Sequence, residues 1–195
     1  MSKYIDFYFD IISPYSYIAH KKIQKIKESQ KIIFNYKPIL LGGLHNLAGI
    51  SAPAFNKYKM KNMRSDCELV SKKNGIAFQW NLKFPINSLS IMRGYLSIND
   101  RLKEEYINIF FNAYWKDNLD LSSEKEFSKL LENVKIDRKF FFEKIKEESI
   151  KNNLKELTSN AFKKEVFGAP TFIVNNKIFW GQDRLEYALE ELNEN

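Results

Sequence analysis

The chain opens on a short apolar run, a helical pattern and a second apolar run. Residues Tyr4 to Phe9 are rich in aromatic side chains and predict a buried strand, while apolar positions recur at near-helical spacing between Tyr17 and Ile26. Ile32 to Tyr36 predicts a second strand, after which residues 39 to 43 are expected to lead into a polar, glycine-containing loop. This order predicts two parallel strands joined by a right-handed crossover.

Helical patterns dominate from about residue 54 to residue 167, and extended structure then returns. Thr171 to Val174 and Lys177 to Trp180 predict a hairpin, because Asn175 and Asn176 between them tolerate a positive φ. An amphipathic helix over about residues 184 to 192 is expected to close the chain. The central patterns predict helices at roughly 55–74, 88–98, 101–117, 124–133, 137–147 and 149–166.

The order of these elements predicts an α/β fold. The first and last segments, about 1–53 and 167–195, together suit a thioredoxin-like sheet, and the helices of about 54–166 then form an inserted all-helical subdomain. Neither edge of the helical block carries a Gly/Ser/Pro-rich linker, so we expect residues 1–195 to form one domain. A length of 195 residues with 44% hydrophobic side chains is enough for one core.

The charge distribution and the lack of targeting signals limit the classes of partner that we expect. The 31 Lys and Arg are spread among 24 acidic residues, so the net charge of +7 favours small anionic ligands or solubility over a nucleic-acid surface. No apolar run approaches the roughly 20 residues that span a bilayer, and the N-terminus does not resemble a secretory signal. We therefore expect a cytoplasmic protein with neither a nucleic-acid nor a membrane partner.

The single cysteine, Cys67, excludes an intramolecular disulfide and the exchange chemistry that needs two thiols. On a predicted helix, it is expected to be a small buried apolar residue. His20, on the first helix, and His45, in the expected loop, lack metal-ligand spacing, so no metal site is predicted.

Ser13, Pro14, Tyr15 and Ser16 occupy the turn between the first strand and the first helix, where open α/β folds place ligands. A thiolate beside Ser13 would be stabilised by the positive end of the helix dipole and by a hydroxyl hydrogen bond, which lowers a thiol pKa. The alternative is that Ser13 only caps the helix, since serine before a proline at the first helical position is a common helix start.

Two later turns and one lysine carry further candidate chemistry. A cis Ala169-Pro170 bond would leave the preceding backbone free to pair with an extended peptide. The alternative is that this proline only marks the start of the strand, as a proline before a strand often does. Asp183 either caps the last helix or accepts a hydrogen bond from an α-ammonium group. Lys59 is either solvated or pairs with a ligand carboxylate. Trp180 either packs in the core or lines an apolar pocket.

Four stretches in matching order resemble the 2-hydroxychromene-2-carboxylate isomerase family. That family is similar to the kappa-class glutathione transferases and lies within the DsbA-like group, whose fold is a thioredoxin domain with an inserted helical domain. The resemblance therefore implies a DsbA-like fold and glutathione as cofactor. The four stretches are Asp6 to Asp10 with Ser13 to Ser16, Phe84 to Leu89, Phe167 to Thr171, and Phe179 to Arg184.

The resemblance also implies roles for particular residues. Ser13 corresponds to the serine beside the glutathione sulfur and is the implied catalytic residue, while Ala169 and a cis Pro170 would pair with the cysteinyl part of glutathione. Asp183 would hold the γ-glutamyl end, and Lys59, seven positions before Asp66, would face the glycine carboxylate. Gln182 is the remaining implied cofactor contact, and the implied substrate-pocket residues are Tyr15, Ser16, Asn87 and Trp180.

The chain also departs from the family pattern. Gln182 replaces the usual asparagine, residues 49–53 lack an asparagine contact to ligand, and Asn62 stands where a tyrosine is common. The implied reaction is reversible addition of a bound glutathione thiolate to a conjugated, aromatic-derived acid, followed by ring opening, rotation and expulsion of the thiol. The alternatives are a kappa-like transferase that releases a stable conjugate with a small electrophile and a non-catalytic thioredoxin-like binding protein. By resemblance alone, a homodimer is expected.

Overall fold

The computed structural model describes residues 4–194, and one mixed sheet organises this part of the chain. The sheet has the order β2-β1-β3-β4, and its strands are β1 (Tyr4–Phe9), β2 (Ile33–Pro38), β3 (Thr171–Val174) and β4 (Lys177–Trp180). β1 and β2 are parallel and joined through α1 (Pro14–Ser29), whereas β3 is antiparallel to both β1 and β4. The predicted parallel pair and the final hairpin are confirmed.

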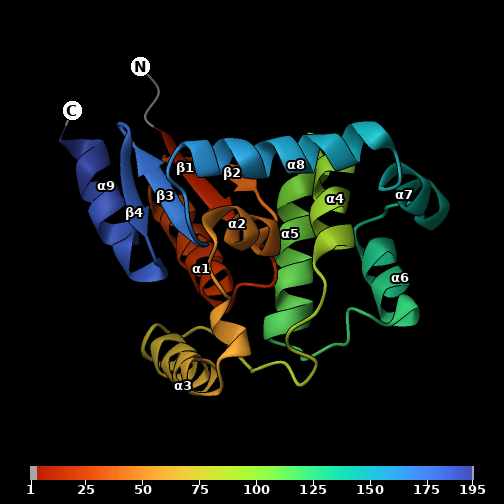
Figure 1. Cartoon of the computed structure of the whole chain (residues 1–195), viewed down its shortest axis with the longest axis horizontal. Helices are drawn as coiled ribbons and strands as arrows, with labels where there is room; N and C mark the ends of the chain where they lie inside the picture. Colours follow the sequence, from red (N-terminus) through yellow and green to blue (C-terminus); the bar gives the residue numbers. More distant parts are fainter. Residues whose placement is uncertain (1–3, 195) are drawn as a thin grey trace.

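Helices fill the interval between β2 and β3, and two further elements follow the hairpin. Figure 1 shows α8 running across the molecule from the sheet to α7, with α4 and α5 beneath it and α3 apart from them. The bounds are α2 (Leu41–Ala48), η1 (Pro53–Phe55), α3 (Lys57–Lys73), α4 (Leu89–Ser97), α5 (Asp100–Trp115), α6 (Glu124–Asn133), α7 (Arg138–Lys144), α8 (Glu148–Lys163), η2 (Gln182–Arg184) and α9 (Leu185–Asn193).

Helix α2 corrects the expected loop after β2, and it carries His45, which was expected in that loop. Gly42 and Gly43 disfavour a helix locally, and Leu40 provides no side-chain cap. The missing cap comes from elsewhere in the fold, because the Asp10 carboxylate accepts a hydrogen bond from the Leu41 amide at 2.8 Å. A hydrogen bond from a residue distant in sequence therefore stabilises the start of a helix that the local sequence does not favour.

The alternating side chains of β1 build two cores. Phe7 and Phe9 enter the large core, where Phe7 stacks on Phe172 of β3 and Phe9 contacts Tyr95 of α4 at ring-centroid distances of 5.4 Å each. Tyr8 enters a smaller cluster on the other face, which includes residues of α2 and α8. The sheet and the helical block thus share one core, which fixes the start of α1 relative to both.

The hairpin turn takes the conformation that its sequence predicts. Asn175 and Asn176 have φ angles of 49° and 64°, the left-handed region that asparagine tolerates. Within residues 4–194, no helix combines the length and the apolar character needed to cross a membrane.

Candidate functional site

Ser13 begins α1 and makes two hydrogen bonds there. Its Oγ accepts from the Ser16 amide at 3.1 Å, and its hydroxyl donates to the Ala169 carbonyl at 2.9 Å. Pro14 is the first helical residue, so the capping interpretation is confirmed. Capping uses an Oγ lone pair and leaves the hydroxyl proton available to a second partner, so it does not exclude a role in chemistry.

The turn before β3 lies against Ser13 although 156 positions separate the two residues. The Ala169-Pro170 peptide bond is cis, as is Phe84-Pro85, which was not anticipated. The Pro170 carbonyl accepts a hydrogen bond from the Gly181 amide at 2.9 Å. The fold therefore brings together three separate segments that the sequence marks as candidates.

The segment after β4 approaches α1 through a short 3-10 turn, η2. Gly181 has a φ of 113°, and a side chain there would come within 2.5 Å of Asp183 Oδ1, so the position requires glycine. Gln182 is 93% buried, its carbonyl accepts from Lys22 of α1 at 3.5 Å, and its Oε1 has no hydrogen-bond partner. This amide oxygen is therefore a buried acceptor that no group of the described chain uses.

Asp183 does not cap the last helix. It lies inside η2, the residue that precedes α9 is Arg184, and neither element has a side-chain cap. The capping interpretation was wrong because the glycine at 181 starts a 3-10 turn that moves the helix start downstream. The carboxylate of Asp183 is exposed, with the Arg184 guanidinium at 3.6 Å.

Tyr15 connects α1 to α3. Its hydroxyl donates to Asp66 Oδ2 at 2.7 Å. Burial and this hydrogen bond to a carboxylate raise the pKa of Tyr15, so the phenol remains a donor at neutral pH. Lys59 lies seven residues before Asp66, about two helical turns along α3, and its side chain is exposed. The structure thus uses Asp66 to hold α3, and Lys59 remains available.

The other predicted pocket residues differ in their surroundings. Ser16 is fully buried, and its Oγ has no hydrogen-bond partner. Asn87 is exposed and accepts from the Leu89 amide at 3.0 Å. Trp180 is 54% exposed, and its ring packs on Phe167 at 4.9 Å. Of these residues, Asn87 also lines a hollow between α4, α6 and α7.

Sequence reasoning missed Asp10 as an organising residue. Its carboxylate is fully buried and accepts hydrogen bonds from the amides of Ile12 (3.2 Å) and Leu41 (2.8 Å) and from Ser88 Oγ (3.1 Å). Burial raises its pKa to about 6, although these hydrogen bonds act in the opposite direction. Its position was the available signal, since it is a carboxylate directly after a buried strand. It ties the Ser13 turn to α2 and α4.

Two buried side chains, Cys67 and His20, are uncharged at neutral pH. Cys67 is a free thiol whose pKa is raised by burial, which confirms the expected small buried residue. His20 is neutral, because burial lowers its pKa to about 3, and its Nδ1 lies 2.8 Å from the Tyr36 hydroxyl. Cys67 is therefore not available as a nucleophile.

Comparison with known proteins identifies the family and its relatives. The family model for the DSBA-like thioredoxin domain matches residues 4–193. The 2-hydroxychromene-2-carboxylate isomerase of Sphingobium xenophagum is 28% identical over 189 residues, covering 96% of both chains. Glutathione S-transferase kappa 1 of Caenorhabditis elegans is 26% identical over 207 residues, covering 97% of this chain and 91% of its own.

The fold comparison gives the same result. A solved structure of 2-hydroxychromene-2-carboxylate isomerase superimposes with a TM-score of 0.89 and 25% identity, covering 98% of this chain and 95% of that one. The resemblance inferred from the sequence motifs is therefore confirmed along nearly the whole chain. On the match over residues 4–193, the chain belongs to the DSBA-like thioredoxin domain family.

Proposed function

We propose that this protein is a glutathione-dependent isomerase of the 2-hydroxychromene-2-carboxylate isomerase type. The observation that carries the proposal is the Ser13 hydroxyl, which lies at the start of α1 and 2.9 Å from the Ala169 carbonyl, beside a cis proline. Full-length similarity to isomerases and kappa-class glutathione transferases supports an isomerase- or transferase-type activity.

The residues at the site fit a peptide-like thiol. The Ala169 backbone beside Pro170 offers a carbonyl acceptor, the positive end of α1 suits an anion, and the buried Gln182 Oε1 is an unused acceptor. Asp183 would hold the α-ammonium of the γ-glutamyl end. Lys59 would pair with the glycine carboxylate from α3. Tyr15, Ser16, Asn87 and Trp180 are the proposed walls for the second substrate.

Ser13 would act by changing the acceptor of its hydroxyl hydrogen bond. In the free chain its O–H points to the Ala169 carbonyl, while its Oγ accepts from the Ser16 amide. A peptide N–H that binds Ala169 would take over that carbonyl and release the Ser13 hydroxyl toward the neighbouring sulfur. Ser13 then donates a hydrogen bond to the thiolate without giving up its proton, and the Ser16 amide holds Oγ in place.

Bound glutathione would supply a thiolate that adds reversibly to a conjugated carbon of the chromene carboxylate and leaves again after ring opening and bond rotation. The chain's own contribution is therefore binding, orientation and stabilisation of negative charge on sulfur. None of these needs a protein nucleophile, which agrees with the buried, protonated Cys67.

The test is turnover of 2-hydroxychromene-2-carboxylate with and without glutathione, together with titration of free thiol before and after the reaction. We expect isomerisation that requires glutathione and leaves the amount of thiol unchanged. A conjugate that consumes one thiol per turnover would instead support a transferase, the second candidate, which the similarity to glutathione S-transferase kappa 1 favours. Equal isomerisation rates with and without glutathione would contradict both.

We further propose that the protein acts in the cytoplasm as a homodimer, following the family resemblance. Light scattering on the purified protein tests the dimer: a mass near twice 23.1 kDa supports it, and a mass near 23.1 kDa contradicts it.

A further inference from the structure

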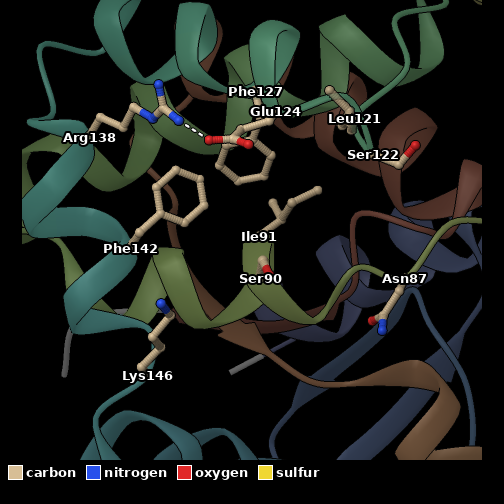
Figure 2. A pocket seen from close by; sticks show the side chains of 10 residues that line it. All are labelled: Asn87, Ser90, Ile91, Leu121, Ser122, Glu124, Phe127, Arg138, Phe142 and Lys146. Atoms are coloured by element: carbon tan, nitrogen blue, oxygen red, sulfur yellow. Dashed lines mark hydrogen bonds and ion pairs between the residues drawn. The ribbon is translucent and has the colours of Figure 1, made fainter.

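A hollow of about 590 Å³ opens between α4, α6 and α7, in the helical block. Its volume falls within the range of about 300–1,000 Å³ that is typical of small-molecule sites. Figure 2 shows Ile91 of α4, Phe127 of α6 and Phe142 of α7 facing this space from three sides. Ile91 and Phe127 are buried and Phe142 is half-buried, so the hollow has an apolar floor.

Cationic side chains lie along one side of the hollow. Arg138 pairs with Glu124 across the gap between α6 and α7, and its guanidinium lies 5.9 Å from the Phe142 ring centre. Lys146 lies on the other side of Phe142 in Figure 2. Its neighbours Lys144 and Lys151 are paired with glutamates, whereas Lys146 makes no ion pair within residues 4–194. The lining therefore carries one uncompensated positive charge next to an aromatic wall.

Of the remaining lining residues, Leu121 is apolar and buried, and the other three are polar and exposed. Ser90, Ser122 and Asn87 add two hydroxyls and an amide, which suit a ligand that keeps one edge in water. Of the residues assigned above to glutathione or its reaction partner, only Asn87 lines this hollow.

We propose that this hollow is a second binding site, which takes a small aromatic carboxylate. The ring would pack on Ile91, Phe127 and Phe142, and the carboxylate would pair with Lys146, with Arg138 nearby. Aromatic rings favour offset or edge-to-face contact with phenylalanine, and a carboxylate completes the free charge of Lys146. Inorganic phosphate would leave the apolar floor exposed, and a neutral ring would leave Lys146 unpaired, so neither fits as well.

The experiment is calorimetric titration of the full chain with naphthalene-2-carboxylate and with its neutral analogue naphthalene-2-methanol. We expect the carboxylate to bind more tightly than the alcohol. Lys146→Ala should weaken carboxylate binding about fivefold, the value of one partly exposed ion pair, and should abolish the preference over the alcohol. Lys139→Ala is the matched control, because Lys139 is an exposed lysine on α7, the helix just before the turn that carries Lys146, and it does not line the hollow.

A second variant tests the cavity itself. Ser90 is exposed and lines the hollow, so Ser90→Phe should fill it and reduce binding of both probes at least tenfold, with an unchanged thermal transition as the folding control. Unchanged affinity in both Lys146→Ala and Ser90→Phe would overturn the proposal. So would loss of naphthalene-2-carboxylate binding in saturating S-methyl glutathione, because the probe would then occupy the glutathione cleft.

The proposal does not depend on glutathione chemistry. Titration with S-methyl glutathione alone tests the function proposed above, and its failure would leave the hollow between α4, α6 and α7 to be judged by the naphthalene probes.

Discussion

Replacing Ser13 by alanine tests two roles of one hydroxyl: its observed place in the fold and its proposed contact with a bound thiol. The change removes an acceptor for the Ser16 amide and a donor that reaches the Ala169 carbonyl in the free chain. Ser13 is 3% exposed, so water will not easily replace either partner. Loss of the acceptor for the Ser16 amide lowers the free energy of unfolding. Loss of the hydroxyl donor raises the pKa of the thiol that is proposed to bind there.

The expected magnitudes follow from these two hydrogen bonds. Loss of a helix N-cap costs about 1 kcal/mol of unfolding free energy. A hydrogen bond to a charged group contributes about 1.5–3 kcal/mol, which corresponds to about 1–2 pKa units on the bound thiol. The positive end of α1 remains in the variant. We therefore expect the pKa of bound glutathione to rise by about 1–2 units in Ser13→Ala but to stay below that of free glutathione.

The assay is ultraviolet absorbance of the thiolate as a function of pH, recorded with saturating glutathione, alongside urea unfolding of the free protein. Ser123→Ala is the control, because Ser123 also caps a helix, accepting from the Glu126 amide at 3.5 Å, but at the start of α6. It should lower stability without moving the thiol pKa. An unchanged thiol pKa in Ser13→Ala would refute the proposed role of the hydroxyl.

Three further substitutions test contacts that hold the helices and the sheet together. Because burial raises the pKa of Asp10 from 3.8 to about 6, the folded state binds more protons than the unfolded state between these values, and stability should fall as pH rises through them. Urea unfolding should therefore show that the free energy of unfolding of Asp10→Asn, taken relative to that of wild type, increases by about 3 kcal/mol from about pH 4 to about pH 7. A difference that does not change with pH would contradict this. In Gly94→Ala the new methyl would overlap the Phe141 ring, so thermal unfolding should show a loss of about 1–3 kcal/mol, whereas wild-type stability would refute the overlap. Tyr15→Phe removes the 2.7 Å bond to Asp66, so hydrogen exchange along α3 should accelerate about tenfold, and unchanged exchange would show that α3 is held by other contacts.

Much of the sheet and of the helical block follows from local pattern. The aromatic run of β1 and the Asn175-Asn176 turn were predictable because burial and positive φ leave clear signals in the sequence. The Ser13 turn was identifiable for the same reason, since a serine before a proline marks a helix start after a strand. These features depend on neighbours in sequence.

The features that sequence reasoning missed depend on contacts between distant segments. Helix α2 starts because Asp10, about thirty positions earlier, accepts the Leu41 amide proton, and no local signal reports that bond. The bond from Ser13 to Ala169 likewise exists only after β3 lies beside β1. The Asp183 cap was wrong because the conformation of Gly181 displaces the helix start. In each case tertiary geometry overrides local preference.

The most direct test of the central claim is calorimetric titration of the purified protein with glutathione and S-methyl glutathione, in wild type, Ser13→Ala and Asp183→Ala. The account predicts that wild type binds both ligands, that Asp183→Ala weakens both, and that Ser13→Ala affects the free thiol more than the methylated one. Absence of binding to wild type at millimolar ligand would contradict the glutathione site, and the function of this thioredoxin-like fold would then have to be sought elsewhere.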